Sequence, residues 1–330
     1  MRRRDFITFV GGMAAGWTAG AHAQPGAMRR IGVLMAHAED DAEFKAYVGS
    51  FRGGLEKLGW SEGRNVRIDF RWGALDDADA RQRSAKELIA LQPDVILSQN
   101  TPPTASMLQQ TQTIPVVFVI VADPVGSGFV ESLARPARNA TGFTVMEPTI
   151  SGKWVELLKD IAPHLHRVSV LFNPATTPYA EIYLTPLKAA AASLGLQAAD
   201  APVHSLPDLA FVIGEQGRTP DAGLVVIPDG FLNVYREEIV SLAARHHVPA
   251  VYPWRFFPDI GGLLSYGSDQ RDLFRLAATY VDRILRGAKP SELPVQAPVK
   301  YELVVNLKAA KALGIEVPLS LQQRADEVIE

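Results

Sequence analysis

Residues 31–60 read IGVLMAHAEDDAEFKAYVGSFRGGLEKLGW, and they set the architecture of the chain. The first six residues are continuously apolar, which is typical of a strand buried on both faces of a parallel sheet. From Phe44 to Leu58 the apolar residues recur at helical spacing, and Gly59 suits the position just after a helix C-terminus. The stretch therefore predicts a buried strand followed by a helix that covers the sheet.

The same alternation of strand and helix continues along the chain and restarts after residue 145. The predicted strands cover residues 65–72, 94–100, 115–121, 167–174, 223–230, 249–254, 261–267 and 301–306, and the predicted helices cover residues 79–92, 103–111, 126–134, 151–162, 186–196, 232–247, 272–287 and 307–315. Such alternation predicts an α/β fold with parallel sheets covered by helices. The restart favours two Rossmann-like lobes joined by crossovers, and a closed (β/α)₈ barrel is the alternative.

The signatures of common cofactor enzymes are missing. A dinucleotide fold needs glycines directly after its first strand, whereas His37, Ala38, Glu39 and Asp40 follow here. The sequence after the leader also contains neither a phosphate-binding loop nor a G-x-S-x-G nucleophile motif. We therefore expect no enzyme activity and no cofactor.

The composition of the chain excludes some kinds of bound metal and some kinds of macromolecular partner. The chain has no cysteine, which excludes disulfides and thiolate metal sites, and we expect no metal. Its formal net charge is -3 and it has no basic stripe, so a nucleic-acid partner is not expected.

The first 23 residues have the pattern of an export signal. Three arginines precede a short, glycine-interrupted apolar run, and Ala21-His22-Ala23 has the form of a cleavage site, so cleavage is expected after Ala23. The pair Arg3-Arg4 resembles a twin-arginine signal. The run is shorter than a membrane-spanning helix requires. Without a cysteine to lipidate, we expect no membrane anchor and a periplasmic location.

Polar residues stand where the predicted strands of the first half end. Ligands of open α/β sheets gather at the carboxyl ends of the strands. Thr101 and Thr104 open a helix, where free backbone N–H groups attract an anionic group. Asp123 follows the strand at 115–121 and could bind an amine. Helix or turn capping is the alternative role for Thr101 and Asp123.

Comparable residues follow the strands of the second half. Asn173 and Asp229 stand at strand ends, with Asp229 a second candidate for an amine. Tyr252, Trp254 and Tyr266 also lie at strand ends, where an aromatic face can stack on a ligand. Each aromatic residue alone is more often part of the core or of its rim, so it is their combination at the strand ends that indicates a ligand.

The order of these motifs resembles that of the ABC transporter substrate-binding protein family that includes tryptophan-type binding proteins. The most specific segments are IPVVFVIVADPVGSGFVESLARPARNATGFT, RDLFRLAATYVDRILRGAKPSELPV and YELVVNLKAAKALGIEVP. The loop MAHAEDD and the aromatic stretch VYPWRFFPDIGG depart from the usual family pattern. Both departures are expected near the ligand, so its identity is not carried over.

The resemblance implies a type I periplasmic-binding fold whose two lobes close on a ligand. It places the first lobe at 27–145 plus 266–294 and the second at 146–265 plus 295–330, after the signal at 1–23. We expect an amino-acid-like ligand or a small aromatic acid, a permease as partner, and a monomer. Two alternatives remain open: a periplasmic α/β hydrolytic enzyme, and a ligand sensor of the same fold.

Overall fold

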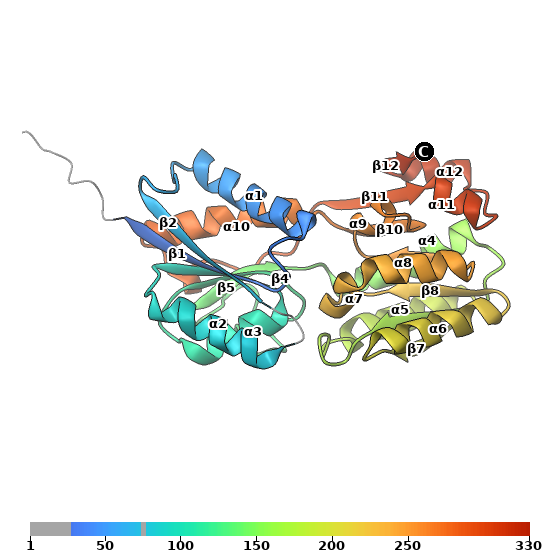
Figure 1. Ribbon diagram of the computed structural model, residues 1–330, viewed down its shortest axis with the longest axis horizontal. Helices are drawn as coiled ribbons and strands as arrows, with labels where there is room; N and C mark the ends of the chain where they lie inside the picture. The colour runs from blue at the N-terminus through green and yellow to red at the C-terminus, as the bar shows by residue number, and fades with distance from the viewer. Residues whose placement is uncertain (1–27, 74–76) are drawn as a thin grey trace, which may run out of the picture.

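The computed structural model describes residues 28–73 and 77–330, so the proposed signal lies outside the described residues. The molecule consists of two lobes side by side, each built around a sheet with helices on both faces (Figure 1). The predicted α/β fold with two lobes is confirmed. The alternative of a closed barrel is wrong, because the strands form two separate sheets with open edges.

The sheet of the first lobe has five strands in the order β2-β1-β3-β4-β5, all parallel. All five residues of β3 and β5 and all six of β4 are buried, as expected for strands covered on both faces. The strands are β1 (Arg29–Met35), β2 (Val66–Trp72), β3 (Val95–Gln99), β4 (Val116–Val121) and β5 (Ala140–Thr144).

Four helices cover this sheet. α1 (Ala42–Lys57) packs beside α10 (Gln270–Leu285) on one face, and α2 (Ala78–Ala90) packs beside α3 (Thr101–Gln110) on the other (Figure 1). α10 comes from far along the chain, so the first lobe is not continuous in sequence. Its contact with α1 is close at Gly54, where a Cβ atom would lie 2.8 Å from Cβ of Ala278.

The sheet of the second lobe has seven strands in the order β12-β11-β10-β9-β8-β6-β7. All neighbours are parallel except β10 and β11, which run antiparallel because β11 enters from the opposite lobe. The strands are β6 (Arg167–Phe172), β7 (Gln197–Pro202), β8 (Ala222–Val226), β9 (Ala250–Tyr252), β10 (Leu264–Ser268), β11 (Tyr301–Asn306) and β12 (Glu327–Ile329).

The helices of the second lobe again lie on both faces of its sheet. α4 packs beside α5, and α6 packs beside α8 (Figure 1). The α-helices are α4 (Ser151–Ile161), α5 (Glu181–Ser193), α6 (Leu206–Arg218), α7 (Gly230–Val234), α8 (Arg236–Arg245), α9 (Phe256–Asp259), α11 (Leu307–Ala312) and α12 (Leu319–Arg324); the 3-10 helices are η1 (Pro148–Ile150) and η2 (Pro290–Glu292). Among the described residues, no helix is long and apolar enough to cross a membrane.

Three chain segments connect the lobes: one after β5, one between β10 and α10, and one between η2 and β11. They are bonded to one another. The Ser268 hydroxyl donates to the Val145 carbonyl at 2.6 Å, and the Glu147 backbone N–H donates to the Tyr301 hydroxyl at 3.1 Å. The domain ranges given above stay a prediction. Residues 266–268 belong to β10 and pair within the second sheet, so strand pairing alone would place the second crossing between the lobes at 268–270 rather than at 266.

One predicted helix does not form. Residues 126–134 contain no helix and instead begin as a series of turns. The Asp123 carboxylate accepts from the Gly126 N–H at 2.7 Å, and Gly128 has a φ of 71°, in the left-handed region. A side-chain cap at the start and a left-handed residue two positions later close the chain into turns before a helix can begin.

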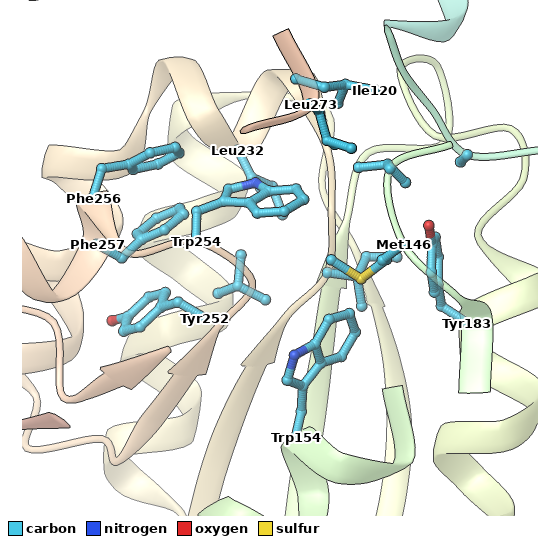
Figure 2. Close-up of a cluster of buried hydrophobic side chains, with 14 of the residues drawn as sticks. Ile120, Met146, Trp154, Tyr183, Leu232, Tyr252, Trp254, Phe256, Phe257 and Leu273 are labelled. Atoms are coloured by element: carbon cyan, nitrogen blue, oxygen red, sulfur yellow. The ribbon is translucent and has the colours of Figure 1, made fainter. Parts of the chain in front are cut away.

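A continuous cluster of buried apolar side chains extends from the first lobe into the second. In Figure 2, Ile120 and Leu273 from the first lobe lie above Met146 of the crossing segment, with Trp254 of the second lobe on the other side. The lobes therefore touch through side chains as well as through the crossing segments.

Candidate binding site between the lobes

The carboxyl ends of β3 and β4 carry the first-lobe half of the candidate site. Thr101 begins α3, is 5% exposed, and accepts from the Ala122 backbone N–H at 3.4 Å. Asn100 precedes it with a φ of 75° and a ψ of 161°, and its side chain accepts from the Thr101 N–H at 2.7 Å. The bond to Ala122 ties the end of β3 to the residue just before Asp123.

Two residues at this edge, Asn100 and Ile120, have a strained backbone conformation. Asn100 has a φ in the left-handed region. Ile120, a β-branched residue, also has a positive φ, of 60°, and it lies at an irregularity in the pairing of β4 with β5. Such conformations are costly for residues other than glycine, and they cluster at functional sites. Their positions on adjacent strand ends mark this edge of the sheet as the candidate site.

The other two first-lobe residues predicted from the sequence have internal partners. The Thr104 hydroxyl is fully buried, donates to the Asn100 carbonyl at 2.7 Å and bonds the Ser98 hydroxyl at 3.0 Å. Asp123 is half-buried and uses one carboxylate oxygen to cap the turn at Gly126. Thr104 therefore fixes the start of α3, while Asp123 caps the turn with one of its two carboxylate oxygens.

Asp229 organises the second-lobe half of the site. It is 2% exposed and accepts from the Asn173 N–H at 2.5 Å, the Thr176 hydroxyl at 2.6 Å and the Phe231 N–H at 2.7 Å. Burial raises the pKa of Asp229, and the hydrogen bonds from Thr176 and Asn173 oppose that rise. Asp229 thus joins the ends of β6 and β8.

Asn173 has a similar, local partner: its side chain accepts from the Ala175 N–H at 2.8 Å. The structure therefore brings Asn173 and Asp229 together, as the strand-end rule predicts. Their carboxylate and amide oxygens hold the loop between β6 and α5 in shape, and that loop carries the residues that face the first lobe.

Residues from the two lobes meet across this site. The Tyr179 side chain, from the loop before α5, lies beside Thr101 of the first lobe and Thr177 of its own loop, and both neighbours lower the pKa of its hydroxyl. Burial raises the pKa of Tyr179, and the nearby Asp229 charge raises it further. A second link joins Asp41 at the start of α1 to Arg236 of α8, at 2.7 Å.

The predicted aromatic residues separate into different places. Tyr252 is 1% exposed and stacks on Phe257 at 4.6 Å inside the second lobe (Figure 2). Tyr266 is half-buried on β10, where it stacks on Tyr301 at 5.8 Å. Trp254 lies at a small cavity between the lobes. Roles for these residues in binding stay predictions.

Trp254 lines a small cavity between the lobes together with Glu43 and Tyr47 of α1 and Gln270 of α10. Its volume is about 20 Å³, which is room for one water molecule. Within residues 28–73 and 77–330, the buried Trp254 Nε1 and Gln270 Nε2 atoms have no hydrogen-bond partner. The lobes therefore lie close together in this conformation.

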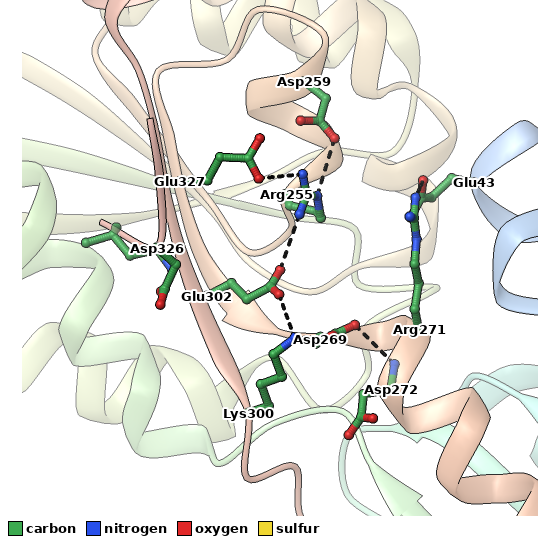
Figure 3. Close-up of polar contacts among 11 residues, drawn as sticks. Glu43, Arg255, Asp259, Asp269, Arg271, Asp272, Lys300, Glu302, Asp326 and Glu327 are labelled. Carbon is green, nitrogen blue, oxygen red and sulfur yellow. Dashed lines mark hydrogen bonds and ion pairs between the residues drawn. The ribbon is translucent and has the colours of Figure 1, made fainter. Parts of the chain in front are cut away.

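Figure 3 shows a charged network beside this cavity. Arg255 contacts Glu327 at 2.8 Å, Asp259 at 3.6 Å and Glu302 at 3.7 Å. Lys300, on the third crossing segment, contacts Asp269 of the second crossing at 2.8 Å. The network ties two crossing segments to each other at the edge of the second lobe.

The acidic residues and histidines bear on the alternative of a metal or hydrolytic site. Among the described residues, no cluster of His, Asp and Glu could hold a metal ion. The Asp229 oxygens are occupied by backbone and hydroxyl donors, so they do not form an acid-base pair with Asp123. Sequence reasoning missed Tyr179 and Tyr183, which stand before the predicted helix at 186–196.

Comparisons with known proteins agree with this geometry. The family model for ABC transporter substrate binding proteins matches residues 30–329. A tyrosine-binding protein of Clostridioides difficile (strain R20291) is 24% identical over 291 residues, covering 87% of this chain and 81% of the relative.

Two solved structures are similar over their whole length. An ABC domain from Streptococcus pneumonia in complex with L-Trp has a TM-score of 0.84 and 26% identity, covering 92% of this chain and 100% of that one. A ligand-free, open substrate binding protein from Clostridium difficile has a TM-score of 0.69 and 24% identity, covering 92% and 99%. These neighbours share the fold predicted from the sequence.

Proposed function

The chain belongs to the ABC transporter substrate binding protein family, and we propose that it is the periplasmic solute-binding component of an ABC importer. It would capture an amino-acid-like ligand or a small aromatic acid between its lobes. The observation that carries the proposal is the meeting of Thr101 and Tyr179, one from each lobe, at the strand ends. A ligand at this position touches both lobes.

The proposed mechanism is closure about the three crossing segments. A ligand that contacts both lobes stabilises the closed arrangement, and closure excludes water from the bound molecule. The bonds at Ser268 and Tyr301 hold the crossing segments to one another while the lobes move. Thr101 and Asp123 are the proposed polar contacts in the first lobe, and Trp254 is the proposed apolar wall in the second.

Relatives support the ligand class, while location and partner rest on the sequence. The tyrosine-binding relative and the L-Trp complex favour an aromatic amino acid here. The signal-like residues 1–23 favour the periplasm, with cleavage after Ala23. An inner-membrane permease would receive the closed, monomeric protein. A sensor of the same fold is the second candidate, and pull-down of a permease from membranes separates the two.

A thermal-shift screen of the protein from Gln24 onward tests the proposal. Each of the common amino acids and a set of aromatic acids is added separately, and the midpoint of unfolding is recorded. A ligand at 100 times its Kd should stabilise the folded state by about 2.7 kcal/mol. A chain that no compound stabilises, or that consumes a compound, contradicts the proposal.

A further inference from the structure

Tyr183 is a fully buried phenol whose ring is held from several sides. It lies on α5, its ring centroid is 6.1 Å from that of Trp154 and 6.4 Å from that of Tyr179. Its backbone carbonyl accepts from the Ser151 hydroxyl at 2.9 Å. Figure 2 shows the ring beside Met146 with its hydroxyl directed away from the helix. The side chain is therefore fixed in position.

The hydroxyl of this fixed ring has no hydrogen-bond partner within the part of the chain that the structure describes. Leaving a buried hydroxyl unpaired costs about 1–3 kcal/mol, and buried polar groups are rarely left so. A phenylalanine would fill the same space without this cost. A bound ligand could supply the hydrogen-bond partner that the described part of the folded chain does not give this hydroxyl.

Contacts place this hydroxyl beside the candidate site. Tyr179 lies one helical turn before Tyr183 and contacts its ring edge-on. Tyr179 also lies beside Thr101, and Thr101 accepts from the backbone N–H of Ala122, the residue before Asp123. The two tyrosines, one in the loop before α5 and one in its first turn, therefore lie near the end of β4.

The charges around the hydroxyl indicate what it can receive. After burial and Tyr179, the groups that raise the pKa of Tyr183 are Tyr301 and the carboxylates of Asp123 and Glu147. Every one of these influences is neutral or negative. A negative potential repels an anionic group and attracts a cationic one. Asp123 lies just after the end of β4 and caps the turn at Gly126 with one of its two carboxylate oxygens.

We propose that the Tyr183 hydroxyl and the Asp123 carboxylate together receive the ammonium group of the ligand. The phenol oxygen accepts one N–H, and the carboxylate accepts another. The ligand is then an amino acid or another primary amine, and not an aromatic acid that lacks the amine. This inference rests on the proposed function, since it assigns one end of a ligand in the same site.

The test compares wild type with Tyr183→Phe and with a matched control, Tyr280→Phe. The Tyr280 hydroxyl, in the first lobe, donates to the Pro294 carbonyl at 2.6 Å. Each variant removes one hydroxyl oxygen from a phenol. Calorimetric titration uses two pairs of probes: L-tryptophan with 3-(indol-3-yl)propanoate, and L-tyrosine with 3-(4-hydroxyphenyl)propanoate. The acids keep the ring and the carboxylate but lack the amine.

Wild type should bind at least one amino acid at least 10-fold more tightly than the matching acid. Tyr183→Phe should weaken binding of that amino acid about 10-fold and change binding of the acid less than 2-fold. Without ligand, Tyr183→Phe should unfold at the same temperature as wild type or higher, because its hydroxyl bonds nothing. Tyr280→Phe should unfold at a lower temperature and keep wild-type affinity.

Three results would overturn the inference and leave the proposed function intact. They are equal wild-type affinity for amine and acid, an equal effect of Tyr183→Phe on both, and loss of stability in Tyr183→Phe comparable to that in Tyr280→Phe. If wild type binds none of the probes and no other amine or acid, the proposed function fails and this inference fails with it.

Discussion

Asn100 shows at the scale of one residue how the candidate site is held. Its φ of 75° and ψ of 161° fall in a region that is almost exclusive to glycine. The side chain offsets part of that strain by accepting from the Thr101 N–H, and the Asn100 N–H donates to Val119 of β4 at 2.9 Å. An unfavourable backbone is thus kept in place by bonds to the start of α3 and to β4.

Replacing Asn100 separates the strain from the bond. Asn100→Ala keeps the strain and loses the cap, so it should lower the free energy of unfolding by about 1–3 kcal/mol. Asn100→Gly also loses the cap, but it relieves the strain and should be at least about 1 kcal/mol more stable than the alanine variant. Urea unfolding measures both. Equal stability of the two variants would show that the backbone here is not strained.

His37 gives a prediction about pH. It follows β1, is 4% exposed and stacks on Phe44 at 3.6 Å. Burial lowers its pKa to about 3, against the opposing effect of Asp41. Between about pH 6.5 and pH 3 the unfolded chain therefore binds a proton that the folded chain does not, and stability falls as the pH falls.

The contribution of His37 is about 1.4 kcal/mol for each pH unit below about 6.5. His37→Phe keeps a flat ring and removes the titration. The free energy of unfolding of the variant minus that of wild type should increase by about this amount between pH 6 and pH 5. This difference should stay constant above pH 7. Urea unfolding at these pH values measures both proteins. Parallel curves across the whole range would contradict the assignment.

The sequence predicted the position of a residue in the fold where that residue follows a strand, while its role in binding stays a prediction. Thr101, Asn173 and Asp229 lie at the edges that the strand-end rule gives, with side chains that also serve as caps. Tyr179 and Tyr183 were missed because nothing in the local pattern shows that a tyrosine before a predicted helix will contact the other lobe. Tyr252 follows a strand as well, yet its ring turns into the core.

At the scale of elements, the strands and helices with strong periodicity were predictable and the weaker ones were not. β7 has mostly exposed or half-buried residues, because it is the edge of the second sheet, so its pattern lacks an apolar signal. α5 begins at Glu181, five residues before the start that was predicted at Pro186, and Pro186 lies inside the helix. A proline usually marks the start of a helix, which explains the error.

The contact between α1 and α10 gives a prediction that separates packing from helix propensity. Alanine is favoured over glycine within a helix by about 0.8–1 kcal/mol. At Gly53 a Cβ atom would meet nothing within 4 Å, so Gly53→Ala should raise the free energy of unfolding by about that amount. At Gly54 it would lie 2.8 Å from Ala278 Cβ and 3.1 Å from the Arg275 carbonyl oxygen.

Gly54→Ala should therefore lower the free energy of unfolding by about 1–3 kcal/mol, because α1 and α10 are pushed apart. The two glycines are adjacent in one helix, so each variant is the control for the other. Denaturant unfolding of both variants beside wild type decides the sign. A Gly54→Ala protein as stable as Gly53→Ala would mean that the two helices have room to separate.

At the scale of the whole molecule, the two lobes and their order follow from the sequence, but their contact does not. The restart of the strand-helix pattern after residue 145 predicts a second sheet without placing it against the first. From the sequence, Arg236 would be expected to be exposed at the start of an amphipathic helix, and no sequence pattern pairs it with Asp41. Only the folded structure brings the loop after β1 to the start of α8 (Figure 1).

The Asp41–Arg236 pair should favour the closed arrangement even without ligand. Its side chains are 15% and 19% exposed, and the Arg236 guanidinium also donates to the Asn233 carbonyl and lies 5.6 Å from the centre of the Phe256 ring. Such a pair is screened less by water than a surface pair and is worth about 1 kcal/mol or more. Losing it should make the open form roughly 5-fold more populated relative to the closed form.

Arg236→Ala should therefore enlarge the radius of gyration of the ligand-free protein and weaken ligand binding a few-fold, because closure must then overcome a less favourable equilibrium. Small-angle X-ray scattering with and without ligand measures the first effect, and calorimetric titration the second. The control is Arg324→Ala, which removes a 3.2 Å pair with Asp160 inside the second lobe and should change neither quantity. If Arg236→Ala lowers the stability of the fold but leaves the radius of gyration unchanged at every ligand concentration, the pair only packs α8 and does not hold the lobes together.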